Sequence, residues 1–527
     1  ALGQLVGETR YGTRLDAAAL ANLAPGSALP ALPATGEADR VTEYAYDRAG
    51  RLRMRVEGGE LQVSSTYTAF GELASLSDPL LLAQFYRYDR AGRQVAQERQ
   101  ISGQTRTATE RRVDVFGRVV EERDAQGNVR RHAYDRLGRE VQTEDGTGGR
   151  RAVRYDAFGR VLSVVDALGQ ETRQVYDDAT GSVTLIAASG VATRTERNAH
   201  GETVRVVDGE GRETVYRYDR DGRQVGVETA AGATRTRYDS AGQVFETVDA
   251  GGTVTRYAYD AAGRVLSRTV DPAGLALSTR YRYDAQGRTA SVTDAAGVET
   301  VTRYDAQGRV SEVVVDPAGL ALSTRYEYNV RGDRIAVTTA AGTVRYAYDE
   351  LGRRVAETVD PAGLALTTRY AYDANDNVVA VTGPDGAVTR HVYDAANRLT
   401  HTIDADGHVM ERRYDAAGHE LATTQYAIAI VLPSTGAERN SLLAALRPDA
   451  ADRCFRQFYD RDGRVTARLD ALGSLTEYRY DASGRVIETR RRATLVASAA
   501  DGVVPTVPDS AADRVSRTVY DAAGRAE

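Results

Sequence analysis

The sequence lacks several features on which membrane proteins, disulfide scaffolds and common enzymes depend. Cys454 is the single cysteine, so a disulfide framework is excluded. The longest apolar run, YAIAIVLP at 426–433, is far shorter than the roughly 18–20 residues of a membrane span. No phosphate-binding loop, G-x-S-x-G, H-E-x-x-H or paired zinc-ligand motif is present. These absences argue against a membrane span and against the common enzyme classes.

Lysine and tryptophan are also absent. All 68 basic residues are therefore arginine, and they are interspersed with acidic residues to give a formal charge of −6. Without a long basic block, nucleic acid is not an expected partner. The first residues, ALGQLVGETRYGTR, show no charged-then-apolar signal pattern. We expect the chain to be a section of a longer protein.

An internal repeat dominates what is present. The stretch RYDAQGR occurs at 282–288 and again at 303–309, and related Tyr-Asp pairs recur about every 21 residues. Degenerate copies such as YNVRGD from Tyr328 fill the gaps, which gives about 21 units. The Tyr of the Tyr-Asp pair falls at Tyr46, Tyr88, Tyr134, Tyr155, Tyr176, Tyr218, Tyr238, Tyr259, Tyr283, Tyr304, Tyr348, Tyr372, Tyr393, Tyr414, Tyr459, Tyr480 and Tyr520.

Each unit contains a second turn near its middle, such as DAAG at 294–297 or DADG at 404–407. Between turns lie six or seven residues rich in Val, Thr, Arg and Tyr, a length and composition typical of strands. The sequence therefore predicts an all-β fold. It is a long antiparallel hairpin ribbon of about 42 strands, which must twist and curl, with short helical or loop inserts. In ETVTRY (299–304) neither face is wholly apolar, which indicates a sheet wetted on both sides.

The motif residues are predicted to have structural roles. The Tyr side chains form a stacked aromatic ladder, the Asp accepts backbone N–H groups, the Gly takes φ > 0, and the Arg begins the next strand and pairs with a carboxylate. An Asp that recurs at every turn is not a unique catalytic group. In the two RYDAQGR copies the motif residues are Tyr283, Asp284, Gly287 and Arg288, and Tyr304, Asp305, Gly308 and Arg309.

Other reactive side chains are explained by their place in the repeat. His401, His408 and His419 lie near Asp404 and Asp406, which invites a metal hypothesis, but surface histidines on hairpins are the favoured reading. Cys454 has Val41 and Val515 as counterparts in sister units, which indicates an apolar strand position. We predict no catalytic, cofactor-binding or metal-binding residue.

The repeat is interrupted in two ways. Three units carry a longer connection, DPAGLAL, at 271–277, 316–322 and 360–366, and we expect these loops to protrude at one rim. Three other units end in a shared Ala-Asp-Arg segment that follows a Pro/Ala/Leu-rich insert. In one of them, 438–453, a short helix is predicted with Asn440 or Ser441 as cap.

These breaks divide the chain into six predicted segments. They are a partial repeat with an insert (1–36), a repeat spiral (37–419), an insert with a short helix (420–449), further repeats (450–485), a Pro/Ala-rich insert (486–510) and a last repeat (511–527).

The Tyr-Asp-x-x-Gly-Arg motif at this spacing resembles the RHS/YD-repeat family over roughly residues 37–525. That family includes bacterial Rhs polymorphic toxins, the B and C components of insecticidal Tc toxins, and the shell of animal teneurins. The resemblance implies a sheet that spirals into a hollow shell, which in bacterial relatives encloses a toxic C-terminal domain. The family's self-cleavage motif contains Asp-Pro-x-Gly-Leu. We do not transfer that role to Asp271-Pro272-Ala273-Gly274-Leu275, because its three copies sit inside ordinary units.

Two functions are carried forward. The first is a non-enzymatic shell section of a secreted or exported bacterial Rhs or Tc-like toxin. Its partners are the rest of its own chain, an enclosed toxin domain, and a delivery or immunity protein. The second is a cell-surface adhesion protein that binds a protein or glycan through the inserts. No cofactor is expected for either function.

Overall fold

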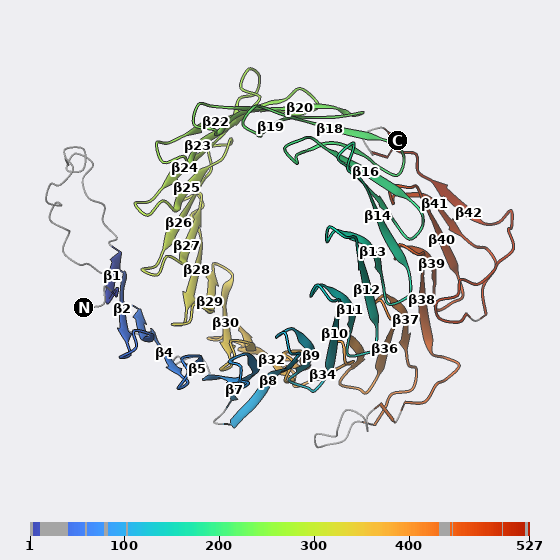
Figure 1. The fold of residues 1–527 in the computed structure, drawn as a ribbon, viewed down its shortest axis with the longest axis horizontal. Helices are drawn as coiled ribbons and strands as arrows, with labels where there is room; N and C mark the ends of the chain where they lie inside the picture. The colour runs from blue at the N-terminus through green and yellow to red at the C-terminus, as the bar shows by residue number, and fades with distance from the viewer. Residues whose placement is uncertain are drawn as a thin grey trace. The chain divides into compact units, whose positions relative to one another are not determined.

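The structure is a computed structural model, and it describes residues 4–10, 40–57, 61–77, 83–101, 104–431, 443–444, 446–497, 499–521 and 525–526. In these residues 42 strands form a single sheet. Strands that follow one another in the chain pair antiparallel as hairpins (Figure 1). The predicted all-β hairpin ribbon, with two strands per unit, is confirmed.

The first half of the ribbon contains strands β1 to β21. They are β1 (Gly7–Arg10), β2 (Arg40–Tyr46), β3 (Leu52–Glu57), β4 (Leu61–Tyr67), β5 (Leu73–Ser77), β6 (Gln84–Tyr88), β7 (Gln94–Ile101), β8 (Gln104–Val113), β9 (Val119–Asp124), β10 (Val129–Tyr134), β11 (Glu140–Glu144), β12 (Arg150–Tyr155), β13 (Val161–Val165), β14 (Glu171–Asp177), β15 (Ser182–Ile186), β16 (Ala192–Arg197), β17 (Thr203–Val207), β18 (Glu213–Tyr218), β19 (Gln224–Thr229), β20 (Gly232–Tyr238) and β21 (Val244–Val248).

The second half contains strands β22 to β42. They are β22 (Val254–Tyr259), β23 (Val265–Val270), β24 (Leu277–Tyr283), β25 (Thr289–Thr293), β26 (Glu299–Tyr304), β27 (Val310–Val315), β28 (Leu322–Tyr328), β29 (Arg334–Thr339), β30 (Gly342–Tyr348), β31 (Arg354–Val359), β32 (Leu366–Tyr372), β33 (Val378–Thr382), β34 (Val388–Tyr393), β35 (Leu399–Ile403), β36 (Val409–Tyr414), β37 (Glu420–Gln425), β38 (Arg453–Tyr459), β39 (Val465–Leu469), β40 (Leu475–Tyr480), β41 (Val486–Arg491) and β42 (Arg514–Arg517).

The chain divides into two compact units. The first unit contains Ala1–Arg111 and Thr255–Ala371, and the second contains Arg112–Val254 and Tyr372–Glu527. Each unit therefore combines an early and a late part of the ribbon.

A β-bulge precedes almost every motif Tyr. In the β26–β27 hairpin Arg303 pairs with Glu312 but Tyr304 pairs with Val310, so Ser311 has no partner across the ladder. A bulge increases the local right-handed twist of the strand pair. A bulge in almost every unit therefore adds twist to the ribbon at regular intervals.

Burial follows the repeat. The residue eight positions after the motif Tyr is buried in many units, because the side chains on both neighbouring strands close over it. Glu312, for example, lies between Arg303 and Arg325. We call this position +8, and where it is buried it holds a small residue or Glu. Its buried members are Ala96, Ser163, Gly226, Glu246, Ser291, Glu312, Ala336, Ala422, Ala467 and Glu488.

Two apolar clusters form where inserts cover the sheet. In the first, Ile403 and Val409 pack against Ile430, with Tyr426 and Leu446 beside them. In the second, Phe458, Ala467, Leu469 and Leu475 pack against Val496, Ala499 and Val507 of the later insert. Each insert thus contributes the apolar side chains that its part of the sheet buries.

The predicted insert boundaries need correction. Strand β37 occupies 420–425 and β41 occupies 486–491, so strand pairing extends into both predicted inserts. The reason is that each hairpin completes its second strand before the chain leaves the sheet. The predicted helix caps Asn440 and Ser441 lie outside the described residues. Residues 443–444 are helical, whereas 446–449 have no regular secondary structure.

The DPAGLAL loops project from the sheet. Leu275, Leu320 and Leu364 at their tips are 77%, 76% and 77% exposed. The loops need backbone conformations that L-residues rarely adopt, with φ near +50° at Asp271 and Ala276 and at the equivalent residues of the other copies. In the described part of the chain, no helix is long and apolar enough to cross a membrane.

Candidate functional site

The repeated turn is built around the carboxylate of its Asp. Asp284 Oδ1 accepts hydrogen bonds from the backbone N–H groups of Gln286 and Arg288, both at 2.9 Å, and Oδ2 accepts one from Arg288 Nε at 2.6 Å. Gly287 has φ of 84°, and its N–H donates to the Asp284 carbonyl oxygen at 3.0 Å. The turn thus satisfies its own polar groups within five residues.

Hydrogen bonding keeps the turn carboxylate ionised. Burial opposes ionisation of Asp284, but the hydrogen bonds from the Arg288 N–H and guanidinium outweigh it, so the pKa of this carboxyl lies below its usual value. In the turn that begins at Asn329, the acidic residue is the fifth residue, Asp333, and not the first. There Asn329 Oδ1 accepts from the Asp333 N–H, and its amide donates to the Asp333 carboxylate, both at 2.9 Å. The hydrogen bonds between the first and fifth residues of the turn therefore persist when the carboxylate is on the fifth residue.

The motif Tyr is held at its hydroxyl and at its ring. The Tyr304 hydroxyl donates to the Thr289 carbonyl oxygen at 2.9 Å, and the Arg288 guanidinium carbon lies 4.2 Å from the centre of its ring. Tyr283 has the same arrangement, with its hydroxyl 2.7 Å from the Val265 carbonyl oxygen and Arg264 at 4.6 Å from its ring. At the next unit Arg309 lies over the ring of Tyr328 at 4.6 Å.

The predicted ladder of directly stacked Tyr rings is wrong. Motif Tyr residues are two strands apart, which is about 9.6 Å, whereas ring centres in contact lie about 4.5–7 Å apart. The guanidinium of the preceding unit fills that space as a cation–π contact. In the described residues the one ring-on-ring stack is between His419 and Tyr459, at 4.7 Å, where His419 occupies the Arg position of the motif.

In the second unit two rows of turns face one another, and we call this contact the seam. Mid-unit turns of β9–β18 meet the Tyr-Asp turns of β33–β41, which lie beside them in Figure 1. Gln126 Nε2 donates to Asp373 Oδ2 at 2.5 Å, and Asn375 Nδ2 donates to Asp124 Oδ2 at 2.7 Å. The partners are 247 and 251 residues apart in sequence.

The seam continues turn by turn in a constant order. The Ser189 N–H donates to Asp462 Oδ1 at 2.9 Å, and the Ser483 hydroxyl donates to Asp208 Oδ2 at 3.0 Å. Close backbone approach requires Gly209, where a Cβ would lie 2.6 Å from the Ala482 carbonyl oxygen. Sequence reasoning missed the seam, because nothing local to either turn identifies its partner.

Each described insert is closed by the Asp of its Ala-Asp-Arg end. Asp452 Oδ1 accepts from the Ala427 N–H at 2.8 Å, and Asp513 Oδ1 accepts from the Ala493 N–H at 2.9 Å. Both inserts also begin alike, since the Ile430 N–H donates to the Gly407 carbonyl at 2.9 Å and the Val496 N–H to the Gly473 carbonyl at 2.8 Å. The Asp of the shared Ala-Asp-Arg ending therefore accepts a hydrogen bond from one of the first residues of its insert.

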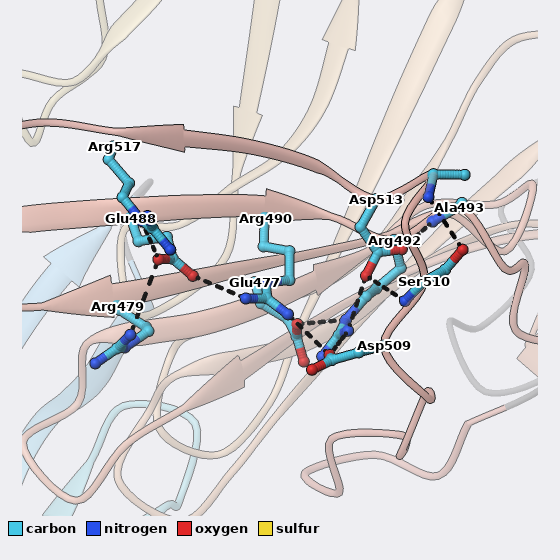
Figure 2. Close-up of polar contacts among 11 residues, drawn as sticks. Glu477, Arg479, Glu488, Arg490, Arg492, Ala493, Asp509, Ser510, Asp513 and Arg517 are labelled. Carbon is cyan, nitrogen blue, oxygen red and sulfur yellow. Dashed lines mark hydrogen bonds and ion pairs between the residues drawn. The ribbon is translucent and has the colours of Figure 1, made fainter.

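Ion pairs clamp the later insert to the sheet, as Figure 2 shows. Arg492 lies within 2.6 Å of Glu477, 2.5 Å of Asp509 and 3.0 Å of Asp513. Backbone N–H groups and Arg492 lower the pKa of Asp513. Asp501 adds a second clamp, because it accepts from Arg413 Nε at 2.8 Å and from Arg456 Nε at 3.1 Å.

A buried carboxylate continues this network across the sheet. Glu488 lies 2.9 Å from Arg517, 3.4 Å from Arg490 and 3.9 Å from Arg479 (Figure 2). Hydrogen bonding to Arg517 is the main cause that lowers its pKa. Buried glutamates such as Glu312 and Glu488 lie at +8 opposite arginines of the neighbouring strands. The sequence contains these residues, but their pairing can be recognised only once the strand register is known.

Within the residue set of the metal hypothesis, the ligand atoms of Asp404, Asp406 and His408 lie within 4.8 Å of one another, whereas His401 and His419 lie elsewhere. Asp404, Asp406 and His408 gather at one turn, where Asp404 Oδ1 accepts from the N–H groups of Asp406 and His408. His401 lies in β35, and burial lowers its pKa. His419 Nδ1 donates to Asp415 Oδ2 at 2.8 Å, as part of its own turn. The three histidines are thus distributed over separate repeat positions.

Cys454 occupies a strand position. It pairs with Thr424 across the ladder, and the Thr424 hydroxyl lies 3.4 Å from its sulfur. It is unpaired with any other cysteine and half-buried.

Solved structures share this fold. The Tc holotoxin pore of Photorhabdus luminescens aligns with a TM-score of 0.60 at 16% identity, over 86% of this chain and 27% of the other. The TcdB2-TccC3 structure aligns at 0.57 and 14%, over 92% and 32%. TcdB2-TccC3-TEV aligns at 0.59 and 16%, over 93% and 30%. The chain therefore spans about a third or less of the chains it resembles. No curated protein matches it.

The sequence itself matches the family described as RHS Repeat over more than half of its length. The matched segments are 113–150, 155–192, 197–234, 238–276, 266–300, 283–321, 304–344, 328–365, 372–409 and 459–495. They coincide with the hairpins whose Asp-centred turns and Arg-covered Tyr rings are described above. The chain belongs to the RHS repeat family.

Proposed function

We propose that this chain is a wall section of an Rhs- or Tc-like toxin carrier. It encloses or carries a toxic C-terminal polypeptide that lies outside this chain, and it is secreted or exported from a bacterium. The observation that supports this most directly is a 42-stranded sheet whose apolar clusters, in the described residues, lie beneath its own inserts. A long sheet with polar side chains on both faces suits a partition between two aqueous spaces.

The wall has no catalytic part in this proposal. The motif residues Tyr283, Asp284, Gly287 and Arg288, and their counterparts Tyr304, Asp305, Gly308 and Arg309, act as staples that fix each hairpin to the next. The remainder of the longer chain, the enclosed toxin domain and a delivery or immunity protein are its partners. The seam supports the role, because it joins rows of turns about 250–275 residues apart.

Protease protection tests the carrier function. In the complete gene product that contains this segment, we expect the polypeptide C-terminal to it to resist a protease that digests the same polypeptide when it is expressed alone. The resistance should disappear when the wall is unfolded with urea. Equal digestion rates for the carried and the free polypeptide would contradict the proposal.

A second candidate is binding of a protein or glycan through the inserts. It is favoured by one observation, the exposure of Leu495 and Val503 on an insert that ion pairs hold firmly to the sheet. The double substitution Leu495→Ser and Val503→Ser, which leaves the residues packed on Phe458 in place, should abolish cell binding if this candidate is right and leave protease protection unchanged.

A further inference from the structure

A groove of about 510 Å³ crosses strands β37 to β41 in the second unit. Its floor is a row of residues paired strand to strand, Gln457 with Arg468, Arg468 with Thr476, and Thr476 with Arg491. Thr423 and Phe455 form a second pair beside it. The groove has the size of a small-molecule site, and its side chains come from rigid strands.

The repeat provides its own baseline for these positions. Arg468 follows its motif Tyr by nine residues, where several units have Val, as at Val292, Val313 and Val337. Two other units also have arginine there, Arg55 and Arg268, so the departure is clearest at Phe455. Phe455 precedes its motif Tyr by four, where the units of Tyr283, Tyr304 and Tyr328 have Thr. Departures of a regular sequence from its own pattern mark places where something other than the fold is selected.

The two arginines in the groove differ from the motif arginines. Most motif arginines bind the Asp of their own turn, as Arg288 does. Arg491 instead donates to the Ser474 hydroxyl at 2.9 Å, and the Arg468 guanidinium lies 5.8 Å from the centre of the Tyr478 ring. Within the described ranges neither arginine pairs with a carboxylate.

The acidic residues of the groove are already engaged. Asp470 Oδ1 accepts from the N–H groups of Leu472 and Ser474 within its turn. Glu420 accepts from the Thr423 hydroxyl and lies 3.9 Å from Arg412. Arg468 in β39 and Arg491 in β41 line the groove on either side of Thr476 in β40. In the described residues neither guanidinium has a carboxylate partner.

We propose that this groove binds a sugar acid, a pyranose ring that carries a carboxylate. A guanidinium fork matches a carboxylate in geometry and charge, and Arg468 and Arg491 flank Thr476 on both sides. Phe455, 41% exposed, and Tyr478 offer apolar surfaces for the C–H face of the ring. Gln457, Thr423 and Thr476 supply donors and acceptors for ring hydroxyls. The site is separate from the proposed carrier function and does not depend on it.

Three matched probes test the assignment on the intact chain. Binding of galacturonate, galactose and acetate is measured by isothermal titration and by saturation-transfer NMR. Galacturonate and galactose differ in the carboxylate at one carbon, and acetate presents the carboxylate alone. We expect galacturonate to bind at least about tenfold more tightly than either of the others, because it alone uses both halves of the groove.

Two substitutions that introduce residues found at the same positions of other units test whether the sugar acid binds in this groove. Arg468→Val and Phe455→Thr place in the groove the residues that other units carry there, so their hairpins are expected to fold. Each should weaken galacturonate binding about tenfold or more. Arg268→Val changes an arginine nine residues after another motif Tyr and should leave binding unchanged.

Several results would overturn the assignment. They are no saturable galacturonate binding, acetate binding as tight as galacturonate, or equal loss in Arg268→Val and Arg468→Val. A circular dichroism spectrum unchanged from wild type keeps loss of binding distinct from loss of fold.

Discussion

Strands β24–β27 and strands β35–β41 contain the same turn motif but bury different side chains. In β24–β27 the +8 residues Ser291 and Glu312 are buried, Glu312 between Arg303 and Arg325, and Val314 is the buried apolar residue. In β35–β41, Ile403, Phe458, Leu469 and Leu475 are buried beneath the inserts. In the described residues, the clusters of buried apolar side chains thus lie where an insert covers the sheet. The units without an insert, which we call the plain repeat, are held mainly by polar and cation–π contacts.

The largest expected effect is on the insert-covered region. Phe458 is 0% exposed, so Phe458→Ala should lower the local free energy of opening of β38–β41 by about 3–5 kcal/mol, measured by hydrogen exchange. Phe116→Ala is the control, because Phe116 is 79% exposed on a turn, and it should change the value by no more than about 0.5 kcal/mol. Equal effects would remove the distinction between the two regions.

The seam should respond to added volume. Gly209→Ala introduces a Cβ that would meet Val191 Cγ1 of its own row and the Ala482 carbonyl of the other row, so contact between the two rows should loosen at a cost of about 1–3 kcal/mol. Hydrogen exchange of 208–211 and 481–484 reports the change. Gly251→Ala, whose Cβ would lie 3.3 Å from Asp249 Oδ1, should have a smaller effect. Faster hydrogen exchange at 208–211 with unchanged exchange at 481–484 would mean that the two rows of turns do not stabilise each other.

In the plain repeat the turn carboxylate is the strongest contributor. Asp284→Ala leaves two backbone N–H groups without their acceptor and should cost about 1–3 kcal/mol in local stability. Asp284→Asn retains an acceptor, as Asn329 does in its own turn, and should cost less. Hydrogen exchange of the β24–β25 hairpin compares the two variants, and a larger loss for Asn would show that charge outweighs geometry.

A buried carboxylate makes part of the plain repeat sensitive to acid. Hydrogen bonds from Ser323 and Arg325 lower the pKa of Glu312 from 4.5 to about 2. Because the folded pKa is the lower one, the stabilisation is complete above pH 4.5 and is lost as pH falls toward 2. The gap in urea midpoint between wild type and Glu312→Gln should therefore narrow from pH 6 to pH 3. A constant gap would mean that Glu312 acts through packing.

The smallest effect concerns a single hydroxyl. Tyr304→Phe loses the hydrogen bond to the Thr289 carbonyl but keeps the ring beneath Arg288, so it should cost about 0.5–1.5 kcal/mol. Tyr304→Leu loses the cation–π contact as well and should cost more. Hydrogen exchange of β25–β26 separates the two, and equal losses would assign the whole contribution to the hydroxyl.

Local chemistry explains what the sequence predicts well. The hydrogen bonds of the turn at Asp284 all form within five residues, so they can be predicted from the Asp, the Gly and their spacing. The strands can be predicted from the length and composition of the segments between turns. The Tyr ladder was wrong because Arg288 reaches a ring sixteen residues away, and a local pattern does not show which side chain fills a gap between strands.

Long-range contacts were beyond the sequence pattern. Asn375 meets Asp124 only after the ribbon has returned to itself, and Asp501 meets Arg413 across an insert with no repeat of its own. The shared Asp452 and Asp513 were visible as a motif, but their acceptor role required the position of the first insert residues. The groove was visible only in part, because Phe455 departs from the Thr that many units carry four residues before the motif Tyr.

The three DPAGLAL copies have a genetic consequence. They begin 45 and 44 residues apart, and each block begins and ends at the same place in a hairpin. Gain or loss of one block by recombination would leave every remaining strand pair intact and change only the length of the ribbon.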